Sequence, residues 1–141
     1  MIDKRTGLTI PTEDAEQMML MSWVTLMSSS RPELKMLYHI PNGGSRHKAE
    51  AGRFRAMGVR PGVPDLCLPV AIGGKHGLYI ELKRVKGGRV SEEQAAWIAE
   101  LRARGYAAEV CRGWEEAAGV ILRYLRGERP LPMTPDKNQG S

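Results

Sequence analysis

An apolar strand that contains two opposite charges constrains this chain more than any other feature. Side chains alternate along a strand, so the segment from Leu78 to Lys83 places Ile80 and Leu82 on one face and Glu81 and Lys83 on the other. Burying a carboxylate and an ammonium is costly unless the charges are paired or bind a metal. The charged face is therefore either the wet outer face of an edge strand or a functional site.

A second carboxylate stands at the start of the preceding apolar strand. Pro64 and Asp65 come directly before Leu66, and the turn at Gly73-Gly74 leads toward Glu81. If these two strands pair antiparallel, Asp65 lies beside Glu81. Two carboxylates and a backbone carbonyl, that of Leu82, form a hard oxygen site that suits Mg²⁺, with Mn²⁺ as a substitute. Lys83 would then orient or help deprotonate an attacking water and offset the charge of a phosphate.

Composition favours one domain with a polyanionic partner. The chain has 141 residues, 42% of them hydrophobic, which fits a single core that needs no disulfide. Its 21 Lys+Arg against 16 Asp+Glu give a net charge of +5, and its pI is near 9.5. That balance favours nucleic acid, although a solvated basic face is the alternative. The aromatic content of 6% argues against a base-stacking platform for single strands.

Several other classes of protein are disfavoured by spacing. Cys67 and Cys111 lie in apolar runs without a CxxC pair, and no charged-then-apolar leader opens the chain, so we expect a cytoplasmic protein. No apolar stretch approaches the ~18 residues of a membrane helix. Gly73-Gly74-Lys75 lacks the preceding glycine and following Ser/Thr of a phosphate-binding loop, so no nucleotide cofactor is expected.

The predicted element order is α β α β β α β α, an α/β fold with helices on a mixed sheet. Helices are expected at 12–28, 45–57, 91–105 and 114–126, and strands at 34–40, 66–70, 78–84 and 106–111. Thr12 caps the first helix, and the Ser-x-x-Gln spacing of Ser91 and Gln94 predicts a capping box on the third. Residues 12–127 form the domain, 1–11 a loosely ordered segment and 128–141 a Pro-rich disordered tail.

These motifs together resemble a nuclease family. Gly62-Val63-Pro64-Asp65-Leu66, Glu81-Leu82-Lys83-Arg84 and the Ser91–Gln94 helix start are similar to the small phage-type VRR-NUC nucleases of the PD-(D/E)xK superfamily, over about residues 12–126. The resemblance implies that superfamily's mixed sheet flanked by helices, and a Mg²⁺-dependent endonuclease acting on branched DNA. It makes Asp65 and Glu81 metal ligands, Lys83 the catalytic lysine, and Glu16 a first-helix acid that contacts the metal directly or through water.

Glu16 and Gln94 each have a second interpretation. Glu16 shares a helix face with Leu20 and Met27, but Glu13 or Asp14 could equally be the better-placed acid, and an acid in a first turn often only complements the helix dipole. The Gln94 side chain is either part of the catalytic site or fully used by the capping box.

Candidate DNA-binding residues surround the predicted second helix. A loop of small and amide residues before it presents backbone amides to a phosphate, unless it is a plain turn. The loop and basic positions expected to contact DNA are Asn42, Gly43, Gly44, Ser45, Arg46, Lys48, Arg53 and Arg84.

A branched duplex such as a four-way junction needs two active sites for a symmetric cut, whereas this chain offers one, so a homodimer is expected. Two alternatives remain. One is a non-catalytic basic DNA-binding or phage accessory protein that keeps the nuclease fold. The other is a restriction-type endonuclease, which normally needs more chain for base readout.

Overall fold

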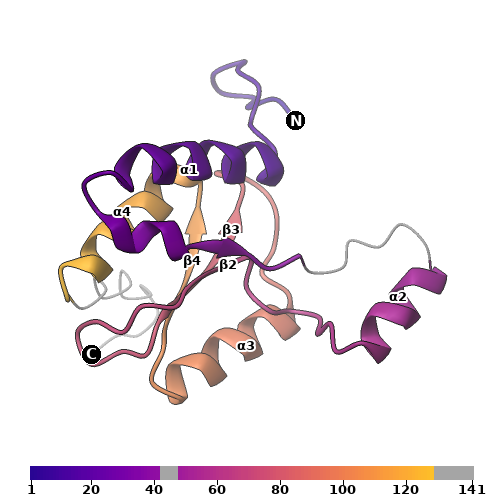
Figure 1. Cartoon of the computed structure of the whole chain (residues 1–141). Coiled ribbons are helices and arrows are strands. Elements are labelled where there is room, and N and C mark those ends of the chain that lie inside the picture. The colour runs from indigo at the N-terminus through magenta and orange to yellow at the C-terminus, as the bar shows by residue number, and fades with distance from the viewer. Residues whose placement is uncertain (42–47, 129–141) are drawn as a thin grey trace, which may run out of the picture.

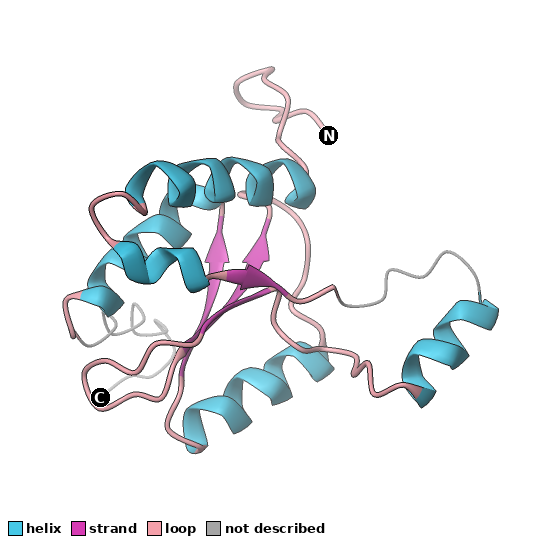
Figure 2. Cartoon of the chain, viewed as in Figure 1, coloured by secondary structure: helices cyan, strands magenta, loops and turns pink. Residues whose placement is uncertain are grey.

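The computed structural model of the chain describes residues 1–41 and 48–128. It has an α/β fold, as predicted (Figure 2). The helices are α1 (Glu13–Met27), α2 (Lys48–Ala56), α3 (Glu92–Ala103) and α4 (Trp114–Leu125), with a 3₁₀ helix η1 (Pro32–Met36). The strands are β1 (Tyr38–His39), β2 (Leu66–Leu68), β3 (Leu78–Lys83) and β4 (Ala107–Arg112).

The four strands form one mixed sheet in the order β1-β2-β3-β4. The first three strands pair antiparallel, and β3 pairs parallel with β4. Helices α1 and α4 lie on one face of the sheet and α3 lies on the other, whereas α2 stands apart from the rest (Figure 1). Because β3 lies between β2 and β4, it is an interior strand, and the edge-strand interpretation of Glu81 and Lys83 is wrong.

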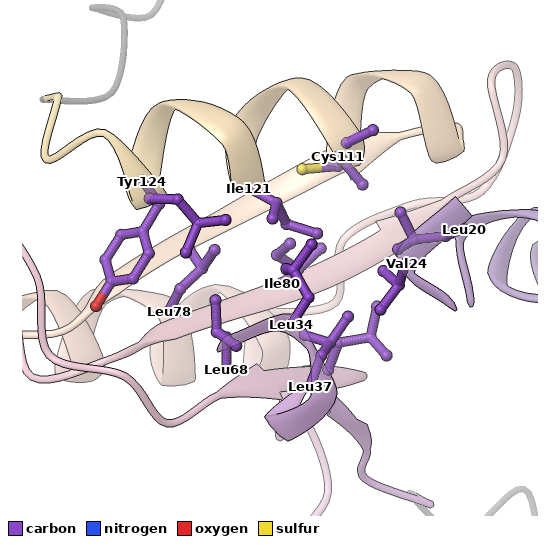
Figure 3. Packing of buried hydrophobic residues seen from close by; sticks show 14 of the residues in the cluster. Leu20, Val24, Leu34, Leu37, Leu68, Leu78, Ile80, Cys111, Ile121 and Tyr124 are labelled. Atoms are coloured by element: carbon purple, nitrogen blue, oxygen red, sulfur yellow. The ribbon is translucent and has the colours of Figure 1, made fainter. Parts of the chain in front are cut away.

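The main core fills the space between the sheet and helices α1 and α4 (Figure 3). Ile80 from β3 packs there with Leu20 of α1 and Ile121 of α4, and each is at most 1% exposed. Full burial of such a side chain contributes about 1.5–3 kcal/mol. A smaller cluster under α3 contains Ile98 and Ala108. The apolar face of β3 thus anchors the strand, and its alternate residues point to the α3 side.

The predicted caps are present. The Thr12 hydroxyl accepts a hydrogen bond from the Ala15 amide at 3.1 Å and begins α1. At α3, the Ser91 hydroxyl accepts from the Gln94 amide at 3.1 Å, and the Gln94 side-chain oxygen accepts from the Ser91 amide at 2.9 Å. The capping box therefore fixes both the start of α3 and the position of the Gln94 side chain.

One predicted strand is wrong over most of its length. Residues 34–40 contain only the two-residue β1, because the segment from Pro32 to Met36 is a 3₁₀ helix. Pro32 favours the start of a helix. Because a 3₁₀ helix has three residues per turn, Leu34 and Leu37 lie on the same side, and both are buried. In β2 the strand ends at Leu68 rather than 70, because Pro69 has no N–H for the ladder.

The N-terminal segment makes backbone hydrogen bonds of its own. Residues 1–10 form a short hairpin, with hydrogen bonds from the Asp3 amide to the Leu8 carbonyl and from the Ile10 amide to the Met1 carbonyl. Of the predicted tail at 128–141, residues 129–141 lie outside the described residues, and so do residues 42–47. No helix in the described ranges is long and apolar enough to cross a membrane.

Candidate active site

Glu81 and Lys83 are buried on the α3 side of β3, where they are 2% and 6% exposed. Their side chains form an ion pair, with Lys83 Nζ at 3.7 Å from Glu81 Oε1. Two charges at this depth need strong compensation to offset the loss of hydration. The strand therefore holds a charged pair where an ordinary interior strand would carry apolar side chains.

Asp65 completes a carboxylate pair with Glu81, as predicted from the strand arrangement. In the antiparallel register Leu66 lies opposite Ile80, so the residue before β2 lies next to Glu81. The Leu82 amide donates to Asp65 Oδ2 at 2.8 Å, which holds the carboxylate against β3. On its other side, the Asp65 carbonyl accepts from the Ile40 amide at 2.7 Å and contacts His39 Nδ1 at 2.9 Å.

The carboxyl group of Glu81 is strongly perturbed. Burial and then the neighbouring Asp65 charge raise its pKa from the ordinary 4.5 to about 8, although Lys83 opposes the shift. The close approach of the Asp65 carboxyl group and the charge of Glu13 also act in the raising direction. Glu81 Oε1 accepts from Gln94 Nε2 at 2.9 Å, but the buried Oε2 has no hydrogen-bond partner among the described residues. Glu81 Oε2 is therefore available to a ligand.

Gln94 makes the hydrogen bonds of the capping box and also contacts the Glu81 carboxylate. Its side-chain oxygen completes the capping box with Ser91, and its side-chain nitrogen donates to Glu81. The two interpretations are compatible because an amide carries an acceptor and a donor at opposite ends. Gln94 thus couples the start of α3 to the orientation of the Glu81 carboxylate.

The first-helix acid that faces this site is Glu13. A methyl group added at Gly88 would lie 3.3 Å from Glu13 Oε1 and 4.0 Å from Lys83 Cδ, so the Glu13 carboxylate and the Lys83 side chain border the same small space. The buried Glu16 has another partner: its Oε2 accepts from the Trp114 amide at 2.8 Å. Glu16 thereby caps α4, whose preceding residue Gly113 offers no side-chain cap. The role of Glu16 at a metal stays a prediction.

Substitutions distinguish the roles of Glu13 and Glu16. We expect Glu13→Gln to reduce cleavage with a stability change of at most about 0.5 kcal/mol, because Glu13 makes no cap. Glu16→Ala is expected to cost about 1–3 kcal/mol by leaving the Trp114 amide without an acceptor. Thermal melts and cleavage rates measure both effects. Glu16→Gln keeps an acceptor oxygen; if this variant melts normally but is inactive, Glu16 rather than Glu13 is the catalytic acid.

The predicted DNA-binding residues are only partly described. Asn42, Gly43, Gly44, Ser45 and Arg46 lie outside the described residues, and so does the Lys48 side chain. Arg53 is exposed on α2, the helix that stands apart from the sheet (Figure 1). Arg84 directly follows Lys83 and is half-buried at the rim of the site.

The donor set suits a hard divalent cation. Asp65 and Glu81 place two carboxylates in contact, and the orphaned Glu81 Oε2 is an available ligand oxygen. The described residues contain no group of three or more His, Cys, Asp and Glu side chains arranged to hold a metal. A cation here would depend on two carboxylates, a backbone carbonyl and water, which is typical of Mg²⁺ and unlike a zinc site.

Comparisons with known proteins agree with this arrangement. The family model of the VRR-NUC domain matches residues 14–115. A solved structure described as a VRR_NUC domain protein is similar at 32% sequence identity with a TM-score of 0.73, covering 84% of this chain and 92% of that chain. A search of curated proteins gives no match. The family match extends from α1 into the start of α4 and includes Asp65, Glu81, Lys83 and Gln94, so this chain belongs to the VRR-NUC domain family and has its nuclease-type fold.

Proposed function

We propose that this protein is a Mg²⁺-dependent endonuclease that hydrolyses phosphodiester bonds of DNA. The observation that carries the proposal is the pairing of the half-buried Asp65 carboxylate with the buried Glu81, in which Glu81 Oε2 has no partner among the described residues and Lys83 Nζ lies 3.7 Å from Oε1. A structural ion pair has no need for a second carboxylate. A nuclease site needs two carboxylates for a cation and an ammonium for the phosphate.

The cation would be held by Asp65, Glu81 and the Leu82 carbonyl, with Glu13 acting directly or through water. Mg²⁺, or Mn²⁺ in its place, would stabilise charge on the scissile phosphate and acidify water. The chain's own groups do the remaining work. Lys83 holds a positive charge beside Glu81, where it orients water and balances the phosphate. Gln94 keeps the Glu81 carboxylate in one orientation through its hydrogen bond.

We further propose a branched duplex, such as a four-way junction, as the substrate and a homodimer as the active form. The net charge of +5 suits a DNA partner, and a symmetric cut needs two sites. Helix α2 supports the dimer: it stands apart from the sheet, and its Phe54 and the following Met57 are exposed one helical turn apart. An apolar surface of this kind on a separate helix is suited to a second copy of the chain.

Both alternative functions remain testable. A non-catalytic DNA-binding protein with this fold would bind DNA without cutting it, and a restriction-type enzyme would cut linear duplex at one sequence. The buried Glu81 and Lys83, with the half-buried Asp65 beside them, favour catalysis over binding alone. Mapping of cut sites on linear DNA distinguishes sequence-specific from structure-specific cleavage.

Cleavage of a DNA panel under different metals tests the proposal. We expect cleavage of junction or flap DNA with Mg²⁺ or Mn²⁺, and none with EDTA. Ca²⁺ should support binding without rapid cleavage, because it holds its ligands in a looser geometry. Gel assays with four-way, flap, nicked and linear substrates measure the rates. Equal cleavage with EDTA would contradict the metal-dependent mechanism, and binding of every substrate without cutting would favour the non-catalytic alternative.

Light scattering at several concentrations tests the dimer. We expect a mass twice the 15.6 kDa of the chain, and a shift to monomer in a Phe54→Asp, Met57→Asp double variant. The exposed Met18 and Leu26 of α1 offer the control, since the Met18→Asp, Leu26→Asp double variant adds the same charge elsewhere. A wild-type monomer on junction DNA would contradict the homodimer, and an unchanged mass in the double variant would exclude α2 as its interface.

A further inference from the structure

The loop at 84–90 directly follows the catalytic strand and carries only positive charge. Its charged residues are Arg84, Lys86 and Arg89, with no acid between Lys83 and Ser91. Glu13 and Lys83 lie against its Gly88, as the close approach at that position shows. The loop therefore forms part of the rim of the candidate active site.

Arg112 of β4 holds this loop through three backbone carbonyls. Its guanidinium donates to the carbonyls of Arg84 at 3.2 Å, Gly87 at 2.8 Å and Gly88 at 3.3 Å. Arg112 lies opposite Lys83 in the β3–β4 register, so the loop is attached to the end of the strand that carries Lys83. A second attachment comes from the N-terminal hairpin, where Asp3 Oδ2 pairs with Lys86 Nζ at 2.7 Å.

The hydrogen bonds from Arg112 determine the direction in which three backbone N–H groups of the loop point. All peptide bonds in the described chain are trans, and in a trans peptide the N–H points opposite to the C=O. The N–H groups of Val85, Gly88 and Arg89 therefore point away from the Arg112 guanidinium. Within residues 1–41 and 48–128, none of these three amides has a hydrogen-bond acceptor. They are available to water or to an anion.

Two of the three loop cations are also available. Lys86 is paired with Asp3, whereas Arg84 and Arg89 form no ion pair with any described residue. Arg89 is exposed and Arg84 half-buried. Free amides and guanidinium groups in one short loop are the donors that proteins use on DNA phosphates.

We propose that the loop at 84–90 is the phosphate-binding element that holds a DNA strand beside Asp65, Glu81 and Lys83. Arg84 and Arg89 contact the phosphates, and Arg112 is a positioning residue that keeps the loop in its binding conformation. The proposal rests on the proposed function, since it takes DNA as the ligand. It assigns DNA contacts to residues of the chain other than those of α2 and of the range 42–47.

Equilibrium binding to junction DNA, measured with EDTA and again with Ca²⁺, tests the loop without relying on cleavage. The Arg84→Gln, Arg89→Gln double variant should weaken binding about 10-fold or more and lower the slope of log K against log salt by roughly 2, at about 0.9 per phosphate contact. Arg112→Lys keeps the charge but cannot bridge three carbonyls. It should weaken binding by about 3-fold or more, and under Mg²⁺ raise KM with little change in kcat.

The matched control is Lys75→Gln, which removes one exposed charge from the turn at the opposite end of β3 and should change binding less than about 2-fold. Thermal melts identify any variant that fails to fold. If Arg112→Lys fails to fold, the Arg84→Gln, Arg89→Gln double variant tests the proposal. Wild-type affinity and salt slope in the double variant, or an equal loss of affinity in Lys75→Gln, would refute phosphate binding by the loop at 84–90. The proposed nuclease function would still stand. A wild-type protein that neither binds nor cuts DNA would overturn the proposed function and the loop together.

Discussion

A Glu81→Gln variant should lose cleavage and, without metal, gain stability. The substitution removes an anionic ligand, so we expect a loss of at least about 10²-fold in the cleavage rate. The same change replaces a buried charge beside Asp65 by an amide that donates to that carboxylate, and an amide needs no counter-ion. The Asp65–Glu81 carboxylate pair is thus expected to lower the free energy of unfolding until a cation binds.

The stability gain has a defined pH dependence. The raised pKa, from 4.5 to about 8, means that the folded protein binds the Glu81 proton more tightly than the unfolded chain does. The metal-free wild type should therefore lose stability as the pH rises from about 4.5 to about 8. Glu81→Gln removes this loss, so its advantage should be absent at pH 4 and reach roughly 1–3 kcal/mol at pH 8. Urea unfolding with EDTA at both pH values measures the difference.

Asp65→Asn is expected to lose cleavage to a similar degree, while its side-chain oxygen keeps the hydrogen bond with the Leu82 amide. Glu109→Gln is the control, because it neutralises a half-buried glutamate whose pKa burial also raises, on the neighbouring strand β4. Cleavage should continue in that variant. Wild-type turnover in Glu81→Gln or Asp65→Asn would refute the proposed ligands.

The parts of the fold that were predictable depend on local signals. Ser91 and Gln94 fix the start of α3 by hydrogen bonds within one turn, and the alternation along β3 sorts its residues between two faces. Asp65 was predictable beside Glu81 because a short turn leaves few registers for the two strands. The position of Asp65 beside Glu81 thus follows from the pairing of two strands that are consecutive in the sequence.

The parts that were not predictable depend on distant packing. Glu13 and Glu16 lie three positions apart on one helix face. Their contacts differ because Glu16 accepts a hydrogen bond from the Trp114 amide at the start of α4. No pattern within α1 reports where the Trp114 amide will be. Similarly, Leu34 and Leu37 fit a strand or a 3₁₀ turn by composition, and packing against the core decides for the turn.

Lys83→Met should lower the rate of DNA cleavage by about 10² or more, the usual size of losing one acid/base or charge-stabilising group. Methionine keeps the length and apolar contacts of the lysine stem, so the fold should remain. The ammonium lies 3.7 Å from Glu81 Oε1 and lowers the pKa of that carboxyl. Its removal should therefore shift the acidic limb of the pH–rate profile upward and leave DNA affinity within a few fold.

Two comparisons decide whether the Lys83 ammonium is catalytic or structural. Lys75→Met removes an exposed ammonium at the far end of β3 and should leave the rate unchanged. Lys83→Arg keeps the charge, but its planar guanidinium cannot replace a point donor at the same site, so a catalytic lysine predicts a low rate in this variant as well. If Lys83→Arg is active and Lys83→Met unfolds, the lysine only neutralises buried carboxylates. A folded, inactive Lys83→Met with a displaced pH profile would place the ammonium in the chemical step.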